Sequence, residues 1–170
     1  MIKLQKTNTI YKVYTWLPIV VLYISVLNEF DLNYLNIDYF SFNFPFILIF
    51  YFTLKDSLHF DYFLVFIAGL INDVVIGFPL GISSLSYVLI CSFSSYLRSI
   101  TIRPNIIKDW FYFLFVISLI NATNYSILFL IFSYELNLTY YLVNNFFTFL
   151  LYIFFTHIFS YYVKGLNEQI

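Results

Sequence analysis

Long apolar segments follow one another along this chain with only short polar gaps, and this feature constrains its fold most. A helix needs roughly 20 apolar residues to cross the hydrocarbon core of a bilayer, with a range of about 17 to 25. The pattern therefore predicts an all-α integral membrane protein, in which residues 1–170 form a single six-helix transmembrane bundle. The expected spans cover residues 10–27, 40–54, 60–76, 80–97, 110–132 and 140–163.

The second span is the least certain to cross the membrane, because segment 40–54 is short and the polar stretch 55–59 follows it. A half-inserted segment and a chain of five spans are the alternatives. The first span follows basic residues, as in a signal peptide, but no small-x-small cleavage site follows it. We therefore interpret it as a retained span.

The composition argues against a water-soluble enzyme, a disordered tail and a nucleic-acid-binding module. Hydrophobic residues make up 62% of the chain, charged residues only 10%, and the mean hydropathy is +0.85. Average soluble proteins are roughly 45 to 50% apolar and about 25% charged. We therefore expect the lipid bilayer, and no nucleic acid, among its partners.

The basic residues fall on one side of a six-span chain whose N-terminus is inside. They are Lys3, Lys6, Lys12, Lys55, Arg98, Arg103, Lys108 and Lys164. Loops rich in Lys and Arg stay on the cytoplasmic side of a membrane. With five spans Lys164 would lie outside, so the even number is favoured and both termini are predicted to be cytoplasmic.

Three of the four glycines and the one carboxylate well inside a span are close together in sequence. Gly69, Asp73 and Gly77 are spaced by four residues, so on a helix they share one face. Small residues on such a face allow a neighbouring helix to approach closely. Pro79 can end one span and open the next, and Gly81 completes a predicted tight outer turn.

Asp73 is the most unusual residue of this stretch, since an ionisable group inside a span is costly and usually has a partner. It is predicted to lie in the outer leaflet, whereas every basic residue lies at the inner side. The carboxyl is then protonated or hydrogen-bonded by neighbours such as Asn72, Ser83, Ser84 or Tyr87. Water, or a cation from another protein, is the alternative partner.

Further polar residues occupy the outer halves of the last two spans and could line an outward pocket together with Asp73. These residues are Asn121, Thr123, Asn124, Asn144, Asn145 and Thr148. The alternative is that they hydrogen-bond between helices, at about 0.6 kcal/mol per bond on average.

Nothing in the sequence favours catalysis. It has no His-Glu-x-x-His cluster, no aspartate pair within spans and no serine and histidine placed on facing helices. The single cysteine, Cys91, excludes an intrachain disulfide and is expected in the core. We therefore predict a protein that is not an enzyme and has no metal or cofactor.

The stretch that contains Asp73 resembles the rod shape-determining protein MreD family. The recurring pattern of that family is a glycine-led span with an aspartate, then Gly-x-x-Leu-Gly opening the next span, which ends in a Tyr-Leu-x-x-Arg-like sequence. Here the pattern is GLINDVVIGFPLG at 69–81, and Tyr96-Leu97-Arg98 followed by Arg103 closes the next span. Its core, Asp-x-x-x-Gly-x-Pro-Leu-Gly, is the informative part.

This resemblance implies a non-catalytic component of the bacterial inner membrane. Its partner would be MreC, with links to MreB, RodA and a class B penicillin-binding protein of the cell-elongation machinery for rod shape and peptidoglycan synthesis. A homodimer is also possible. The resemblance further implies a fold similar to the substrate-binding component of energy-coupling-factor transporters. A vitamin-type small-molecule binding component is therefore the alternative function.

Two groups of candidate residues follow from these arguments. The first group, at the outer end of the third and fourth spans, is expected to dock a partner such as MreC or to form a pocket: Gly69, Asn72, Asp73, Gly77, Pro79, Leu80 and Gly81. The second group is a basic loop with Arg98, Arg103 and Lys108. It is explained either by cytoplasmic topology alone or by contact with anionic lipid or a cytoplasmic partner.

Overall fold

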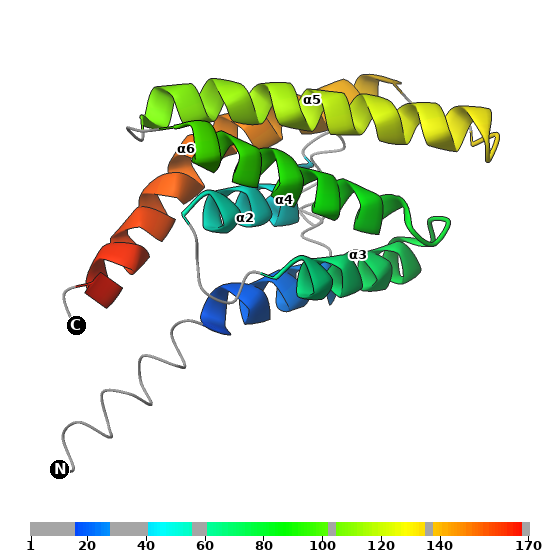
Figure 1. The fold of residues 1–170 in the computed structure, drawn as a ribbon. Helices are drawn as coiled ribbons and strands as arrows, with labels where there is room; N and C mark the ends of the chain where they lie inside the picture. The colour runs from blue at the N-terminus through cyan, green and yellow to red at the C-terminus, as the bar shows by residue number, and fades with distance from the viewer. Residues whose placement is uncertain (1–15, 28–40, 56–60, 102–104, 135–137, 168–170) are drawn as a thin grey trace, which may run out of the picture.

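The computed structural model describes residues 16–27, 41–55, 61–101, 105–134 and 138–167, and all regular structure in these ranges is helical (Figure 1). This confirms the all-α part of the prediction. The helices are Trp16–Leu27, α2 (Phe44–Leu54), α3 (Tyr62–Ile76), α4 (Ile82–Ile100), α5 (Ile106–Leu130) and α6 (Leu138–Asn167).

The helices alternate in direction, so that the described basic side chains gather at one end of the bundle (Figure 1). Lys55 follows the end of α2, Arg98 lies in the last turn of α4 and Lys108 lies in the first turn of α5. We call this the basic end. The opposite end, with the turn between α3 and α4, is the polar end, where Asp73 is the one charged side chain among the described residues.

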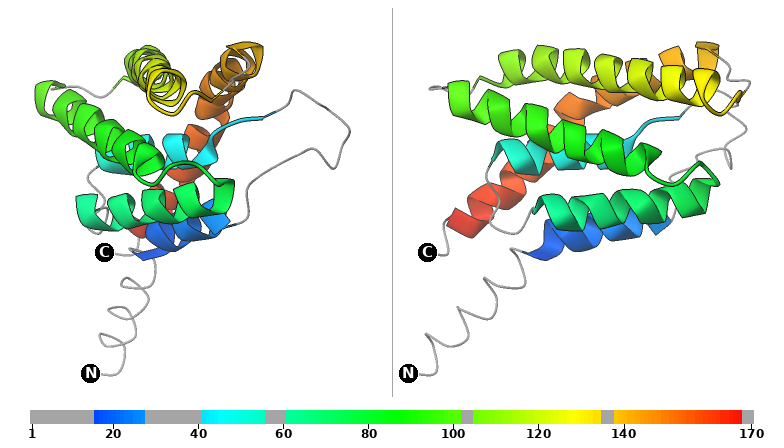
Figure 2. Two further views of the ribbon diagram at one scale, coloured as in Figure 1. Left: turned by 90° about the vertical axis from the view of Figure 1, so that its right-hand side faces the viewer. Right: turned by 45° about the vertical axis from the view of Figure 1, so that its right-hand side comes forward.

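The short helix α2 lies at the centre of the bundle, between the layer formed by α3 with Trp16–Leu27 and the layer formed by α5 and α6 (Figure 2). Nine of its 11 residues are buried, as expected for a helix that is apolar on every side. At 1.5 Å per residue its length is about 16 Å, roughly half of the ~30 Å hydrocarbon core. Helix α2 is therefore shorter than the hydrocarbon core, in keeping with the short apolar run of the predicted second span.

Among the helices of the described residues, two are long and apolar enough to cross a membrane: α5 over Ile106–Leu130 and α6 over Leu138–Tyr161. The helices Trp16–Leu27, α2 and α3 are also apolar but shorter. Only 28% of the most apolar window of α5, and 17% of that of α6, is buried inside the molecule. Most residues in these two windows are therefore at least partly exposed.

Helices α5 and α6 are joined by an aromatic contact near the basic end. The indole ring of Trp110 stacks on Phe149 with ring centroids 4.4 Å apart, and its Nε1–H donates a hydrogen bond to the Phe149 carbonyl at 2.8 Å. Cys91 is buried in the core beside α2, as the sequence predicts.

Candidate functional site

The carboxylate of Asp73 binds the first turn of the neighbouring helix α4. Its Oδ2 accepts a hydrogen bond from the Gly81 backbone N–H at 2.7 Å, its Oδ1 accepts one from the Ser83 N–H at 2.8 Å, and the residue is 0% exposed. The first N–H groups of a helix have no partners within it and carry partial positive charge. Hydrogen bonding by neighbours is thus the arrangement found, and the donors are backbone amides.

Gly69 marks the closest approach between α3 and α4. A Cβ atom added here would lie 2.4 Å from the Ser84 Cα and 2.6 Å from the Ser84 backbone nitrogen. Asn72, on the same helix, donates a hydrogen bond through Nδ2 to Ser83 Oγ at 2.9 Å. Gly69, Asn72 and Asp73 therefore bind α4 of their own chain.

The turn that follows depends on two glycines in left-handed conformation. Gly77 has φ +76° and ends α3, and Gly81 has φ +108° and precedes α4. Neither would bring an added Cβ within 4 Å of another atom, so the turn is open around both. Pro79 is partly buried, whereas Leu80 is 70% exposed.

These positions divide the first group of candidates in two. Gly69 and Asp73 are buried against α4, whereas Leu80 and the surroundings of Gly77 and Gly81 face outward. A partner that approaches this hairpin from outside would therefore meet the turn, and the carboxylate would lie beneath it.

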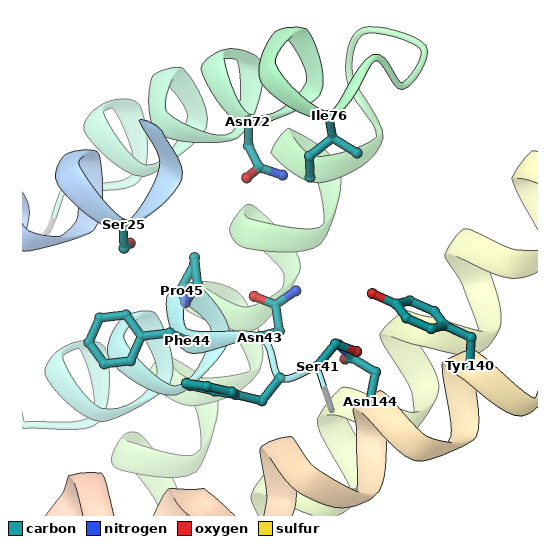
Figure 3. Close-up of a pocket in the computed structure, with 10 residues that line it drawn as sticks. Ser25, Ser41, Asn43, Phe44, Pro45, Asn72, Ile76, Tyr140 and Asn144 are labelled. Atoms are coloured by element: carbon teal, nitrogen blue, oxygen red, sulfur yellow. The ribbon is translucent and has the colours of Figure 1, made fainter. Parts of the chain in front are cut away.

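A cavity lined by both polar and apolar side chains opens beside this turn. It consists of two adjoining hollows of about 230 Å³ and 310 Å³, which share the lining residues Asn43, Asn72, Ile76, Tyr140 and Asn144. We call the two hollows together the polar-end cavity. In Figure 3, Asn72 points into this space from α3, Asn43 from the start of α2, and Tyr140 from α6.

One wall of the polar-end cavity is held by hydrogen bonds between α6 and the segment before α2. The Asn43 backbone N–H donates to Thr148 Oγ1 at 2.9 Å, and Asn144 Nδ2 donates to Ser41 Oγ at 2.9 Å. Thr148 Oγ1 in turn donates to the Asn144 carbonyl at 2.7 Å. The segment 41–43 is thereby fixed against α6.

The polar residues predicted for an outward pocket are used in two different ways. Asn121, Asn124 and Asn144 line the cavity. Asn145, in contrast, bonds the helices together: its Oδ1 accepts from Asn121 Nδ2 at 3.3 Å, and its Nδ2 donates to Ser118 Oγ at 3.1 Å. The lining asparagines also bond to other elements, as Asn124 does to Ser86, so the two interpretations made from the sequence overlap. Asp73, which was expected to share the pocket, is not among its lining residues.

Tyr87 is one of the residues that line the larger hollow, and its hydroxyl is buried. The residue is 0% exposed, and its ring lies edge-on to Phe46 with centroids 5.9 Å apart. Its hydroxyl has no hydrogen-bond partner among the described residues. A buried polar group without a partner is uncommon and costs stability.

The lining of the polar-end cavity carries no formal charge in the part of the chain that the structure describes. Its polar groups are asparagine amides, serine hydroxyls and tyrosine hydroxyls. The described residues also contain no group of three His, Cys, Asp or Glu side chains that could hold a metal ion. The cavity offers binding groups for an uncharged polar molecule.

The second group of candidates is described in part. Arg98 is exposed, and its guanidinium donates to the Thr53 carbonyl at the end of α2 at 3.2 Å. Lys108 is exposed in the first turn of α5. Arg103 lies outside the described residues.

Several lining residues were not singled out from the sequence, namely Asn43, Phe46, Phe78, Ser86, Tyr140 and Tyr141. A signal for Asn43 does exist, because Asn directly before a Pro-containing apolar run is a favourable helix start. Its Oδ1 accepts from the Phe46 N–H at 3.3 Å. No such local signal exists for the tyrosines, since 17 of them are spread along the chain.

The described residues define an all-helical fold with two helices long and apolar enough to cross a membrane, and a cavity at one end whose described lining is uncharged and partly polar. The chain matches no protein-family profile, no curated protein and no solved structure. The case for its function therefore depends on its own residues.

Proposed function

We propose that the chain is a six-span protein of the bacterial inner membrane and a non-catalytic scaffold of the cell-elongation machinery, as the MreD family is. The observation that carries this proposal is the joint role of the residues on which the resemblance rests. Asp73 binds the backbone at Gly81, Gly77 ends α3, and Pro79 and Leu80 form the turn between them. The residues of the motif at 69–81 thus form one structural unit. A high content of Gly and Leu alone would not place them in such an arrangement.

The charge distribution supports insertion with both termini in the cytoplasm. Lys55, Arg98 and Lys108 lie at one end of the bundle, whereas the single described acidic residue at the other end, Asp73, is hydrogen-bonded by backbone amides. Basic residues favour the cytoplasmic side. The basic end would accordingly face the cytoplasm and the polar end the outside.

The outer surface of α6 supports contact with lipid. Large apolar side chains recur there at every fourth residue, and each is more than half exposed: Leu138, Leu142, Phe146, Leu150 and Phe154. A continuous exposed apolar stripe indicates a membrane or a partner. The proposal assigns this stripe to the hydrocarbon core.

The proposed partner at the outer side is MreC, and through it MreB, RodA and a class B penicillin-binding protein. Asp73 is hydrogen-bonded to α4 and Gly69 is packed against it, so neither is accessible to a partner. We therefore assign the docking contact to the exposed turn around Leu80. Burying an exposed leucine side chain contributes about 1.5 to 3 kcal/mol. Replacing it should therefore weaken the complex without disturbing the hairpin beneath.

The test is co-purification of the full chain with MreC from membranes. We expect Leu80→Gln to reduce the recovered MreC roughly tenfold or more, in keeping with the loss of about 1.5 kcal/mol or more. Leu130→Gln is the matched control, because Leu130 is 75% exposed at the same end of the bundle but lies on α5. Failure of the unchanged chain to bind MreC would reject the scaffold function, and an undiminished yield with Leu80→Gln would reject this docking site.

The polar-end cavity favours a second candidate, a small-molecule binding component of a membrane transporter. The described lining carries no formal charge and combines aromatic side chains with a few amides and hydroxyls. Such a lining is typical of a ligand site, in which a few polar groups fix the orientation. The two functions differ in their requirement for a partner. A binding component should retain its ligand as a purified protein, whereas a scaffold requires MreC.

A further inference from the structure

We propose that the start of α5 at the basic end binds an anionic phospholipid, whose phosphate pairs with Lys108 and Arg98 and whose acyl chain lies along Phe111 and Phe115. This inference goes beyond the scaffold and the small-molecule functions, and it rests only on their shared premise that the chain lies in a membrane. Three observations support it: a lysine that no described residue pairs with, the charge balance around it, and an exposed apolar stripe that continues from it.

The three described cations of the basic end differ in how far the protein itself accounts for them. Lys55 and Arg98 lie at the carboxyl ends of α2 and α4, where the helix dipole favours a positive charge. Lys108 lies in the first turn of α5, where the dipole disfavours one. It is exposed and makes no hydrogen bond or ion pair with another described residue. Contacts within the described chain therefore do not explain Lys108.

The carboxylates of the basic end do not cancel the charge of Lys108 and Arg98. Asp109 follows Lys108 directly, but it is only 6% exposed and interacts electrostatically with Lys55. Asp61 begins α3, in the layer on the other side of α2 (Figure 2). An anion that approaches the start of α5 would therefore meet two cations.

An exposed apolar stripe runs along α5 from Lys108 towards the polar end. Phe111 is 58% exposed and Phe115 is 60% exposed, and they follow Lys108 at spacings of three and seven residues, which places all three on one face. Leu119 and Ala122 continue this face. Since α5 is long and apolar enough to cross a membrane, the stripe would lie against the hydrocarbon core, with the cation at its end.

The neighbouring indole places this cation at the level of the lipid headgroups. Trp110 lies two residues after Lys108, and its ring stacks on Phe149 of α6. Tryptophan side chains prefer the interface between the membrane and water. The ammonium group of Lys108 would then be at the depth of the phosphates.

The combination of cation and apolar stripe favours a lipid over a free anion or a cytoplasmic protein. A free phosphate would gain nothing from exposed phenyl rings, and a cytoplasmic protein could not follow a stripe that descends into the bilayer. A phospholipid has both parts in the matching order, a charged phosphate at the surface and an acyl chain beneath it. The anionic lipids are preferred because they carry a net charge for the two cations to neutralise.

The experiment uses the full chain in nanodiscs made from equal amounts of phosphatidylglycerol and phosphatidylcholine. Native mass spectrometry of the released protein counts the lipids that stay bound. We expect phosphatidylglycerol to be retained about fivefold or more over phosphatidylcholine, the factor that corresponds to ~1 kcal/mol per basic residue near an anionic surface. Added inorganic phosphate should not displace it, because phosphate has no acyl chain to contact the stripe.

Lys108→Gln tests whether the lipid binds at the start of α5. It should lower the preference for phosphatidylglycerol about fivefold, whereas Lys108→Arg should retain it. Lys55→Gln is the matched control, because it removes the same charge at the same end of the bundle. Lys55 interacts with Asp109 and does not lie on the stripe of α5, so this variant should keep the preference.

Several results would overturn the inference. Equal retention of the two lipids by the unchanged chain would favour a cytoplasmic partner for these cations, and an unchanged preference in Lys108→Gln would place the lipid elsewhere. An equal loss in Lys55→Gln would indicate a general attraction of cations to the membrane surface, and displacement by inorganic phosphate would indicate a site for a free anion. The scaffold function is measured by recovery of MreC and the small-molecule function by ligand retention, so the failure of either is separate from these outcomes.

Discussion

Asp73 shows how a single carboxylate can lie inside an apolar bundle without a cation. Its two oxygens accept backbone N–H groups of Gly81 and Ser83, at the positive end of the α4 dipole. Gly81 has no side chain with which to cap α4, so the aspartate of the preceding helix takes that role. Charge-assisted hydrogen bonds of this kind are about twice as strong as neutral ones.

The first prediction at this scale concerns the removal of that carboxylate. Asp73→Ala loses both hydrogen bonds, and at roughly 1.5 to 3 kcal/mol for each bond to a charged group we expect a loss of about 3 kcal/mol or more in the free energy of unfolding. Asp73→Asn keeps one acceptor and should lose about half as much. Reversible unfolding of the purified chain in detergent or lipid, followed by circular dichroism, measures both values.

Asp61→Asn is the control for this pair of variants. Asp61 is exposed at the start of α3, and its side chain makes no capping hydrogen bond, so the substitution should change stability by less than about 0.5 kcal/mol. Equal stability of Asp73→Ala and the unchanged chain would contradict the capping role.

At the scale of the elements, the hairpin of α3 and α4 depends on Gly69. A Cβ here would meet the backbone of Ser84, which cannot rotate away as a side chain could. Gly69→Ala should therefore force the two helices apart and cost about 1 to 3 kcal/mol, the usual penalty of overpacking. The free energy of unfolding of the variant measures this cost.

A substitution in the turn gives the matched comparison. Gly77 has open space around it but a φ of +76°, a conformation that Asn tolerates better than Ala. Gly77→Asn should therefore be tolerated better than Gly77→Ala, and it should cost less than Gly69→Ala. The reverse order would place the critical contact in the turn instead of the helix interface.

The positions of the helices were largely predictable from the sequence, whereas the contacts between side chains of different helices were not. Apolar runs and the Gly and Pro positions located the hairpin, because both signals are local. The bond from Asp73 to α4 depends on where the backbone of the next helix lies in space. Likewise, Asn43, Tyr87 and Asn124 come from three separate helices or their ends, and only the packing of those helices places them around one cavity.

At the scale of the whole molecule, the alternating direction of the helices decides which end of the bundle carries the basic residues and which end carries the cavity. The polar-end cavity and the turn with Leu80 lie at one end, and Lys55, Arg98 and Lys108 lie at the other. In a membrane, a ligand or an outer partner would therefore approach from the side opposite to the basic residues. The proposed functions at the polar end both depend on this orientation.

The corresponding prediction is that both chain termini are cytoplasmic. A phosphatase reporter, which is active only outside the cytoplasm, should be inactive when fused after Ile170 and active when inserted after Leu80, in the exposed turn of the polar end. An insertion after Lys55, at the basic end, should be inactive and is the matched control. Phosphatase activity at Ile170 would eliminate the six-span orientation. Activity at Lys55 instead of Leu80 would show the opposite orientation, with the cavity on the cytoplasmic side. A ligand or partner outside the cell could then not reach it.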